Sequence, residues 1–365
     1  MNSEIKNKDF RLFLLQATFT FLIIVALITG INYFIDASQM IKTKTHVQMA
    51  RLALDGNIVA VPENYNERVY QMAIADEMNE IPETLVIGSS RGMYLGEEVT
   101  GYKRLYNSCV SGACIEDYYA LIGLYYQKFS DVPSRVVIET SPWIFYEDNP
   151  EAMWSENYTY LTSCKNFYRE VNGHDLVRNI NKENPYFSIP YFQYNFSMLK
   201  KVGIEVFHDK EAKISVDCSE AADYPDGSIR YRAEDENASI ERLEKVRATE
   251  GAVIYESVNN MIEISDERME EYEKLLQYLL KSNSEVIIYL QPFSVTQCHY
   301  IYDENMNPIF GDIEDYLNDT SLEYGVQLIG SYNAGNFDIT DELFIDFMHL
   351  DKTGTKIVWN YGSKS

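Results

Sequence analysis

Five short apolar runs, each stopping abruptly at a small or polar residue, recur along the 365-residue chain. Runs of this length, rich in β-branched residues and without polar alternation, are typical of strands buried on both faces of a parallel sheet. We therefore predict five strands. They lie in "TLVIGSS" (84–90), "RLYNS" (104–108), "RVVIETS" (135–141), "EVIIYLQ" (285–291) and "VQLIG" (326–330).

Segments with helical spacing of apolar residues separate most of these runs, at 115–129, 265–282 and 312–325. The second should begin at Ser265 or Asp266, because either side chain can cap the first turn. Strands alternating with helices predict a parallel sheet with helices on both faces and a ligand site beyond the carboxyl ends of the strands.

The alternation is absent from two parts of the chain. Residues 36–82 read as a helical linker region, with no strand before Pro82. Between about 143 and 261 the sequence turns rich in Tyr, Asn and Glu, and we interpret it as an insertion over the active face of an α/β domain spanning 83–365. Its tyrosines either pack this subdomain or stack on sugar rings.

Residues 12–35 contain no charge, which at helical rise is long enough to cross a membrane. Lys6, Lys8 and Arg11 precede this segment, so the positive-inside rule predicts a cytoplasmic N-terminus (1–11) and an extracytoplasmic main domain. A cleaved signal peptide is the alternative, but its apolar region runs only ~7–15 residues. We expect a single-pass protein of the cell membrane.

The charge balance of 31 basic against 56 acidic residues, net −25, argues against a nucleic-acid partner. The five cysteines show no C-x-x-C pair, and the histidines show no metal-ligand spacing, so we expect neither metal nor cofactor. Cys109 and Cys114 either close a small disulfide loop or are buried thiols like the rest.

An activated serine needs a base, a group that orients the base, and donors for the oxyanion. Ser90 follows the first predicted strand, and Gly112 follows the second, where a residue without a side chain can present its N–H to a ligand. Asp346 and His349 follow the last strand, three residues apart, so that one turn can direct both inward. These loops should converge on one edge of the sheet.

Three segments resemble sequence blocks of the SGNH/GDSL hydrolase superfamily. "VIGSSR" (86–91), "YNSCVSGA" (106–113) and "DFMHLDKTG" (346–354) are similar to its first, second and fifth blocks, in the same order. The resemblance implies a three-layer, flavodoxin-like α/β/α fold and a Ser-His-Asp triad.

Carried over by position, the resemblance makes Ser90 the nucleophile and, through its N–H, an oxyanion donor. It makes Gly112 a second donor, His349 the general base and Asp346 the orienting acid.

Two departures from the family pattern affect the site. Ser89 replaces the usual aspartate before the nucleophile, and the third block reads "VVIETSPW", without its oxyanion asparagine. Ser141, or else Thr140, is the candidate replacement donor, although either hydroxyl could instead cap the next turn. Ser89 and Arg91 are candidate substrate contacts, and the alternative for Arg91 is a structural salt bridge.

Together with the anchor and "INYFIDAS", these departures resemble the branch that contains the D-alanyl-lipoteichoic acid transfer protein and proteins that accompany membrane-bound O-acyltransferases. The resemblance implies acyl transfer to a cell-envelope glycan or teichoic acid, with such an acyltransferase as a partner. The alternatives are a carbohydrate esterase and an inactive protein that binds glycan or docks an acyltransferase. A further rival is the α/β-hydrolase fold, because residues 88–92 spell G-x-S-x-G.

Overall fold

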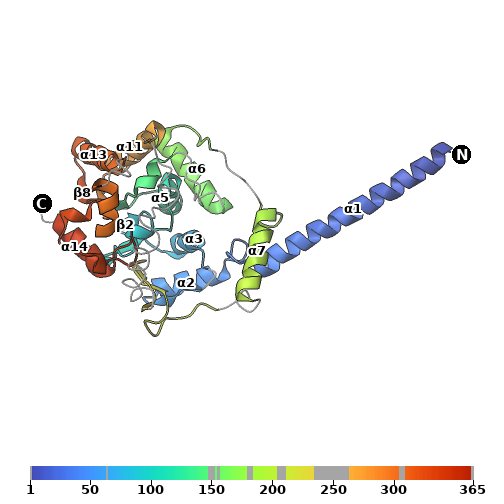
Figure 1. The fold of residues 1–365 in the computed structure, drawn as a ribbon, viewed down its shortest axis with the longest axis horizontal. Coiled ribbons are helices and arrows are strands. Elements are labelled where there is room, and N and C mark those ends of the chain that lie inside the picture. Colours follow the sequence, from blue (N-terminus) through green and yellow to red (C-terminus); the bar gives the residue numbers. More distant parts are fainter. Residues whose placement is uncertain are drawn as a thin grey trace. The chain divides into compact units, whose positions relative to one another are not determined.

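The chain forms two compact units in the computed structural model shown in Figure 1. The structure describes residues 2–62, 65–146, 153, 157–178, 184–203, 211–233, 263–303 and 309–362. Unit 1 comprises Met1–Thr45, Pro62–Asn66 and Asn181–Glu211, and unit 2 comprises His46–Val61, Glu67–Ile180 and Ala212–Ser365.

Unit 2 contains a five-stranded, fully parallel sheet with the strand order β3-β2-β4-β7-β8. Each strand falls within one of the five apolar runs, so the prediction of a parallel α/β sheet is confirmed. The strands are β2 (Thr84–Ile87), β3 (Leu105–Asn107), β4 (Arg135–Glu139), β7 (Glu285–Leu290) and β8 (Gln327–Gly330).

The central strands of this sheet carry apolar side chains on both faces, as buried parallel strands require. Val136 of β4 lies opposite Leu85 of β2 and Val286 of β7 in the register, and all three are buried. Because every strand runs in the same direction, the loops after β2, β3, β4, β7 and β8 share one edge of the sheet.

The predicted helices between the strands are confirmed. They are α5 (Ile115–Phe129), α11 (Asp266–Lys281) and α13 (Ile309–Tyr324). Ser265 is the N-cap of α11, its hydroxyl accepting from Arg268 N. Helix α11 contacts both α5 and α13, whereas α14 (Lys352–Gly362) contacts β8 and α4 (Glu97–Thr100).

The region before β2 contains α2 (Lys44–Leu54) and α3 (Glu67–Glu77), and it also contains a strand that we did not expect. This is β1 (Val59–Ala60), which pairs with β5 (Ala222–Asp223). The prediction of no strand before Pro82 is therefore wrong. Two-residue strands show no alternation in the sequence, because only pairing with a distant partner defines them.

The predicted insertion contributes to several parts of unit 2. Helix α6 (Tyr158–Asn172) packs on α5, and the hairpin of β5 and β6 (Ile229–Arg230) reaches the edge where the strands end. At that edge Asn107 N donates to Asp226 O at 2.7 Å. Residues 234–262 of the insertion, like His208, lie outside the described residues.

All five cysteines lie in the described part of the chain, and all are free. The disulfide alternative for Cys109 and Cys114 therefore does not hold, and both are buried thiols, as are Cys164 and Cys298. Cys218 differs from the expectation because it is exposed.

Unit 1 contains α1 (Asn2–Ile35) and α7 (Ile189–Val202). Within α1, the stretch Phe10–Ile35 is long and apolar enough to cross a membrane. The last turn of α1 and the residues that follow it contact α7 (Figure 1).

Candidate active site

The turn that carries Ser90 follows directly from β2 and depends on two glycines. Gly88 has φ +150°, and a Cβ there would lie 2.5 Å from Glu139 Cβ. At Gly92 a Cβ would lie 2.7 Å from Cys109 Sγ. Between them, Ser89 caps a single 3₁₀ turn, Ser90–Gly92, by accepting a hydrogen bond from Arg91 N. The close backbone approach at both ends therefore excludes any side chain.

The three residues predicted as a triad form a continuous chain of hydrogen bonds. Ser90 Oγ lies 2.8 Å from His349 Nε2, although 259 residues separate them. His349 Nδ1 lies 2.8 and 2.9 Å from the two carboxylate oxygens of Asp346. A carboxylate accepts only, so Nδ1 carries the proton and Nε2 can accept from Ser90. The geometry brings together all three predicted residues.

The Asp346 to His349 loop is held by its own backbone. Asp346 Oδ1 accepts from Met348 N at 2.8 Å and from His349 N at 2.9 Å, so one carboxylate both closes the turn and holds the imidazole. Burial by itself would raise the pKa of Asp346. The charge of His349 and these hydrogen bonds outweigh burial and hold that pKa below its ordinary value, which keeps the carboxylate ionised.

Two backbone N–H groups at this edge are available as oxyanion donors. Within the described residues, neither Ser90 N nor Gly112 N donates a hydrogen bond. Gly112 adopts φ +59°, and Val110 N in the same loop donates to Gly88 O at 3.0 Å, which ties this loop to the Ser90 turn. The backbone amides of Ser90 and Gly112 therefore lie in two loops that contact each other.

The third predicted donor is not available. Ser141 is fully buried, and its hydroxyl donates to Glu139 Oε1 at 2.6 Å. Thr140 is also buried, with its hydroxyl bonded to Tyr272 and the Ile138 carbonyl. The assignment of Ser141 to the oxyanion hole is therefore wrong, because its hydroxyl already donates a hydrogen bond to a neighbouring carboxylate.

The two predicted substrate contacts, Arg91 and Ser89, both point into the protein. Ser89 is fully buried and bonds Ser141 Oγ at 3.0 Å. Arg91 is 1% exposed, and its guanidinium lies 4.1 Å from the Phe293 ring centre. It forms no ion pair within the described residues, so the salt-bridge alternative fails as well. The tight turn after Ser90 directs the next side chain inward.

Arg91 instead joins the Ser90 turn to the loop that carries His349. Its guanidinium donates to the Gln291 carbonyl, and the Gln291 side-chain amide donates to Met348 O at 3.1 Å. Met348 precedes His349, so this path runs from the residue after Ser90 to the residue before His349. The burial of Arg91 lowers the pKa of its guanidinium.

Glu139 is a residue of this site that we did not predict from the sequence. It ends β4 and is fully buried, and Ser89 N donates to its Oε2 at 2.7 Å. The carboxylate thus holds the backbone of the residue before the nucleophile. The signal in the sequence was an acidic residue closing the apolar run "RVVIE", where a buried strand has no place for an unpaired charge.

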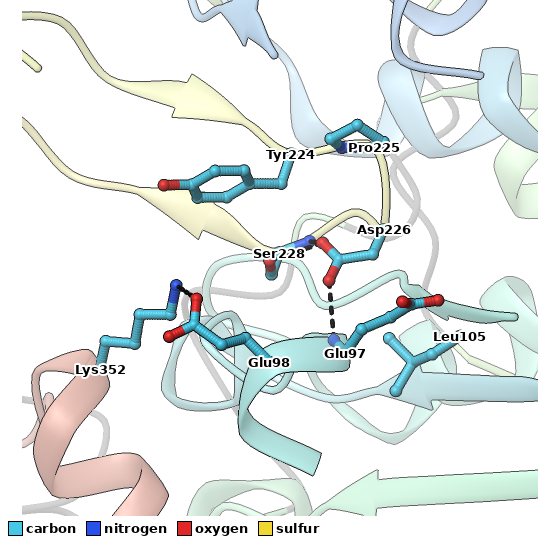
Figure 2. A pocket seen from close by; sticks show the side chains of 8 residues that line it. All are labelled: Glu97, Glu98, Leu105, Tyr224, Pro225, Asp226, Ser228 and Lys352. Carbon is cyan, nitrogen blue, oxygen red and sulfur yellow. Dashed lines mark hydrogen bonds and ion pairs between the residues drawn. The ribbon is translucent and has the colours of Figure 1, made fainter. Parts of the chain in front are cut away.

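A pocket of about 370 Å³ is lined by residues of α4, β3, the β5–β6 hairpin and α14, as Figure 2 shows. Lys352 pairs with Glu98, and Asp226 accepts from Glu97 N at 2.7 Å. The Tyr224 ring lies 5.3 Å from Lys352 Nζ. The lining residues are Glu97, Glu98, Leu105, Tyr224, Pro225, Asp226, Ser228 and Lys352, and they do not include the triad.

In the described part of the chain, no group of three or more His, Cys, Asp or Glu side chains is placed to hold a metal ion. No protein-family model matches the chain, and no curated protein matches its sequence. The chemistry of the site therefore rests on the residues and distances above.

Proposed function

We propose that this chain is a membrane-anchored, SGNH-like serine acyl-transfer protein of the cell envelope. The observation that carries the proposal is the hydrogen-bonded chain from Ser90 through His349 to Asp346. A half-buried, oriented imidazole beside a serine at a strand end has the geometry of nucleophilic catalysis. A histidine that only packed or capped a turn would not need both of its ring nitrogens engaged in this way.

The reaction has two balanced halves. Ser90 Oγ attacks the acyl carbonyl while His349 Nε2 takes the hydroxyl proton, and Asp346 stabilises the imidazolium that forms. When the tetrahedral intermediate collapses, the bond to the leaving group breaks and His349 returns the proton to it, leaving an acyl-serine ester. His349 then deprotonates an acceptor hydroxyl, which attacks this ester, and the proton finally returns to Ser90.

The negative charge of the tetrahedral intermediate needs preorganised donors. Ser90 N and Gly112 N are the candidates, since neither has another partner within the described residues. With Ser141 turned to Glu139, the oxyanion hole that we propose has two donors in place of the family's three. Removing one such donor typically costs about 10²–10³-fold in rate, so a two-donor site remains catalytically useful.

The strand order supports the three-layer, flavodoxin-like arrangement. Numbered along the chain, the five strands follow the order 2-1-3-4-5. Right-handed crossovers would put α5, α11 and α13 on one face and α4 on the other, in agreement with the contacts of α11 with α5 and α13 and of α14 with α4. Within this sheet only β2 precedes Ser90, which argues against the α/β-hydrolase alternative.

The acceptor that we propose is a cell-envelope glycan or teichoic acid. The Phe10–Ile35 span and the basic residues before it would put unit 2 outside the cytoplasm, where such polymers lie. The pocket beside α4 and α14 offers an aromatic ring, Tyr224, next to carboxylates, which suits a polyhydroxyl chain. A membrane-bound O-acyltransferase is the proposed source of the acyl group.

An active-site probe tests the proposal directly. A fluorophosphonate should label the full-length protein, and Ser90→Ala should abolish labelling. Ser219→Ala is the matched control, because Ser219 is an exposed serine whose hydroxyl bonds only Asp217 among the described residues. Equal labelling of wild type and Ser90→Ala would refute the nucleophile.

One observation favours a non-enzymatic protein that binds glycan or docks a partner, namely that the hydroxyl of Ser141 already donates to Glu139.

The acyl content of the envelope polymers in cells that carry Ser90→Ala distinguishes the possibilities. Their acyl content should fall if the protein transfers acyl groups and rise if it is an esterase. Unchanged acyl content, with no labelling of wild type, would favour the non-enzymatic protein.

A further inference from the structure

Helix α7 is attached to the end of the candidate membrane span through buried polar contacts. The Asn32 side-chain amide donates to Ser188 O at 3.0 Å, and Asn195 Nδ2 donates to Asn32 Oδ1 at 3.1 Å. Asn195 Oδ1 accepts from Ala37 N at 2.8 Å. These bonds satisfy polar groups in the last turn of α1, so α7 is fixed at the level where the apolar span ends.

The contact is short along α1 and long along α7. On α1 and just beyond it, the contacting residues lie between Ile31 and Ser38. On α7 the contacts extend from Ser188 to Leu199, over most of the helix. Figure 1 shows α7 lying across the end of α1. If α1 crosses a membrane, a helix across its end would lie along the membrane surface, where interfacial amphipathic helices bind.

The flanks of α7 expose apolar side chains. Ile189 is 56% exposed, Tyr194 is 44% exposed and Phe196 is 42% exposed. At roughly 100° per residue, Tyr194 lies on one side of the face buried against α1, and Ile189 and Phe196 lie on the other. Phe34, at the end of α1, is 71% exposed and extends this apolar surface.

The charge of this region is opposite to that of the whole chain. In a protein of net charge −25, residues 184–203 contain two lysines, Lys200 and Lys201, and no acidic residue. Lys200 Nζ lies 4.5 Å from the Phe196 ring centre, and Lys42 Nζ lies 5.0 Å from the Tyr33 ring centre. Aromatic rings beside lysines are the composition of a membrane–water interface.

We propose that α7 is an interfacial helix, with one or both of its apolar flanks in the acyl-chain boundary of the leaflet that adjoins the end of α1 and its lysines at the lipid phosphates. The inference rests on the membrane anchoring of α1 and is independent of the chemistry at Ser90. A lipid surface is favoured over a protein partner because these apolar residues continue directly from the exposed span and are accompanied by cationic side chains.

Depth-dependent quenching tests this placement. The full chain is reconstituted in vesicles of phosphatidylcholine and phosphatidylglycerol that contain lipids brominated on their acyl chains. Tyr194→Trp and Phe196→Trp report on the two flanks. Ser197→Trp is the control, because Ser197 is exposed on the same helix and lies opposite the face buried on α1. The signal of the three native tryptophans is subtracted using wild type.

We expect at least one flank variant to be quenched twofold or more relative to Ser197→Trp, with a blue-shifted emission. If all three variants are quenched equally in vesicles that carry the protein, the placement of α7 is wrong although the membrane anchor stands. The apolar flanks of α7 would then be expected to bind a protein partner. If the chain does not float with the vesicles, the anchor and the inference both fail. Labelling of Ser90 by fluorophosphonate is measured on the same samples and reports separately on the proposed acyl transfer.

Discussion

At the level of single residues, Asp346 has two tasks that one substitution can separate. Its carboxylate holds the His349 imidazole and also accepts hydrogen bonds from two backbone N–H groups. In Asp346→Asn the amide oxygen can still accept from the backbone, but the amide nitrogen would favour the wrong imidazole tautomer. The loop should therefore survive while the basicity of Nε2 toward Ser90 is lost.

We expect Asp346→Asn to slow fluorophosphonate labelling by about 10⁴-fold, as loss of the correct tautomer does in serine proteases. Its unfolding midpoint should stay within a few degrees of wild type, measured by circular dichroism. Labelling within tenfold of wild type would show that the carboxylate does not orient the base.

Glu139 is the second residue whose role can be tested by itself. Its carboxylate accepts from Ser89 N and from the Ser141 hydroxyl, and all three groups are buried. Glu139→Ala leaves a buried N–H without a partner and should lower the free energy of unfolding by about 2–4 kcal/mol and slow labelling of Ser90. Glu139→Gln can still accept from Ser89 N and donate to Ser141, so it should recover most of the labelling rate.

Urea unfolding and labelling rates of the two Glu139 variants distinguish positioning from general destabilisation. A positioning role predicts that labelling stays slow in Glu139→Ala at temperatures where that variant is fully folded. If folded Glu139→Ala labels at the wild-type rate, the carboxylate supports only the stability of the sheet.

At the level of elements, the turn after β2 and the loop after β3 place different demands on their glycines. Gly88 has no room for a Cβ, because Glu139 Cβ would lie at 2.5 Å. At Gly112 a Cβ would meet only Met153 Cε at 3.7 Å, so its positive φ is the main cost of substitution.

We therefore expect Gly88→Ala to destabilise the protein by about 3 kcal/mol or more, through the clash and the strained backbone together. Gly112→Ala is the matched substitution and should cost only about 1 kcal/mol. Thermal unfolding of the two variants checks the order. Equal losses of stability would mean that β2 and β4 can separate enough to admit a methyl group.

At the level of the whole molecule, the stability of unit 2 should depend on pH through His46 in α2. Burial lowers the pKa of His46 to about 4 from an ordinary value of 6.5. Between these values the unfolded chain binds a proton that the folded chain excludes, so stability falls as pH decreases from about 6.5 to about 4. At pH 5 the loss from this residue is about 2 kcal/mol.

His46→Gln removes the titrating group without adding charge. Between pH 7 and pH 5, we expect the free energy of unfolding of wild type to fall by about 2 kcal/mol more than that of His46→Gln. Urea unfolding of the full chain at both pH values measures the difference. The same pH dependence in both proteins would show that His46 is not the group responsible.

Much of the architecture and the triad could be predicted from sequence alone. The strands stand out because burial on both faces forces a continuous apolar run, and Ser90, Asp346 and His349 stand out because they follow such runs at the shared edge of a parallel sheet. The long apolar stretch in α1 is equally evident in the sequence, because an uncharged segment long enough to cross a membrane stands out in a chain rich in charge. Local composition was sufficient for the strands and the apolar stretch, whereas the triad prediction also drew on the resemblance of three segments to SGNH/GDSL blocks.

Tertiary structure alone decided which polar side chains at that edge are turned into the protein. Arg91, Ser89 and Ser141 are polar residues beside Ser90. All three are turned inward around Glu139, which ends β4, and Gln291, which directly follows β7. The direction of a side chain beyond a strand end depends on contacts between residues far apart in the chain, and sequence spacing does not encode them. For the same reason, the strand β1 and the attachment of α7 to α1 became visible only when the distant partners were brought together.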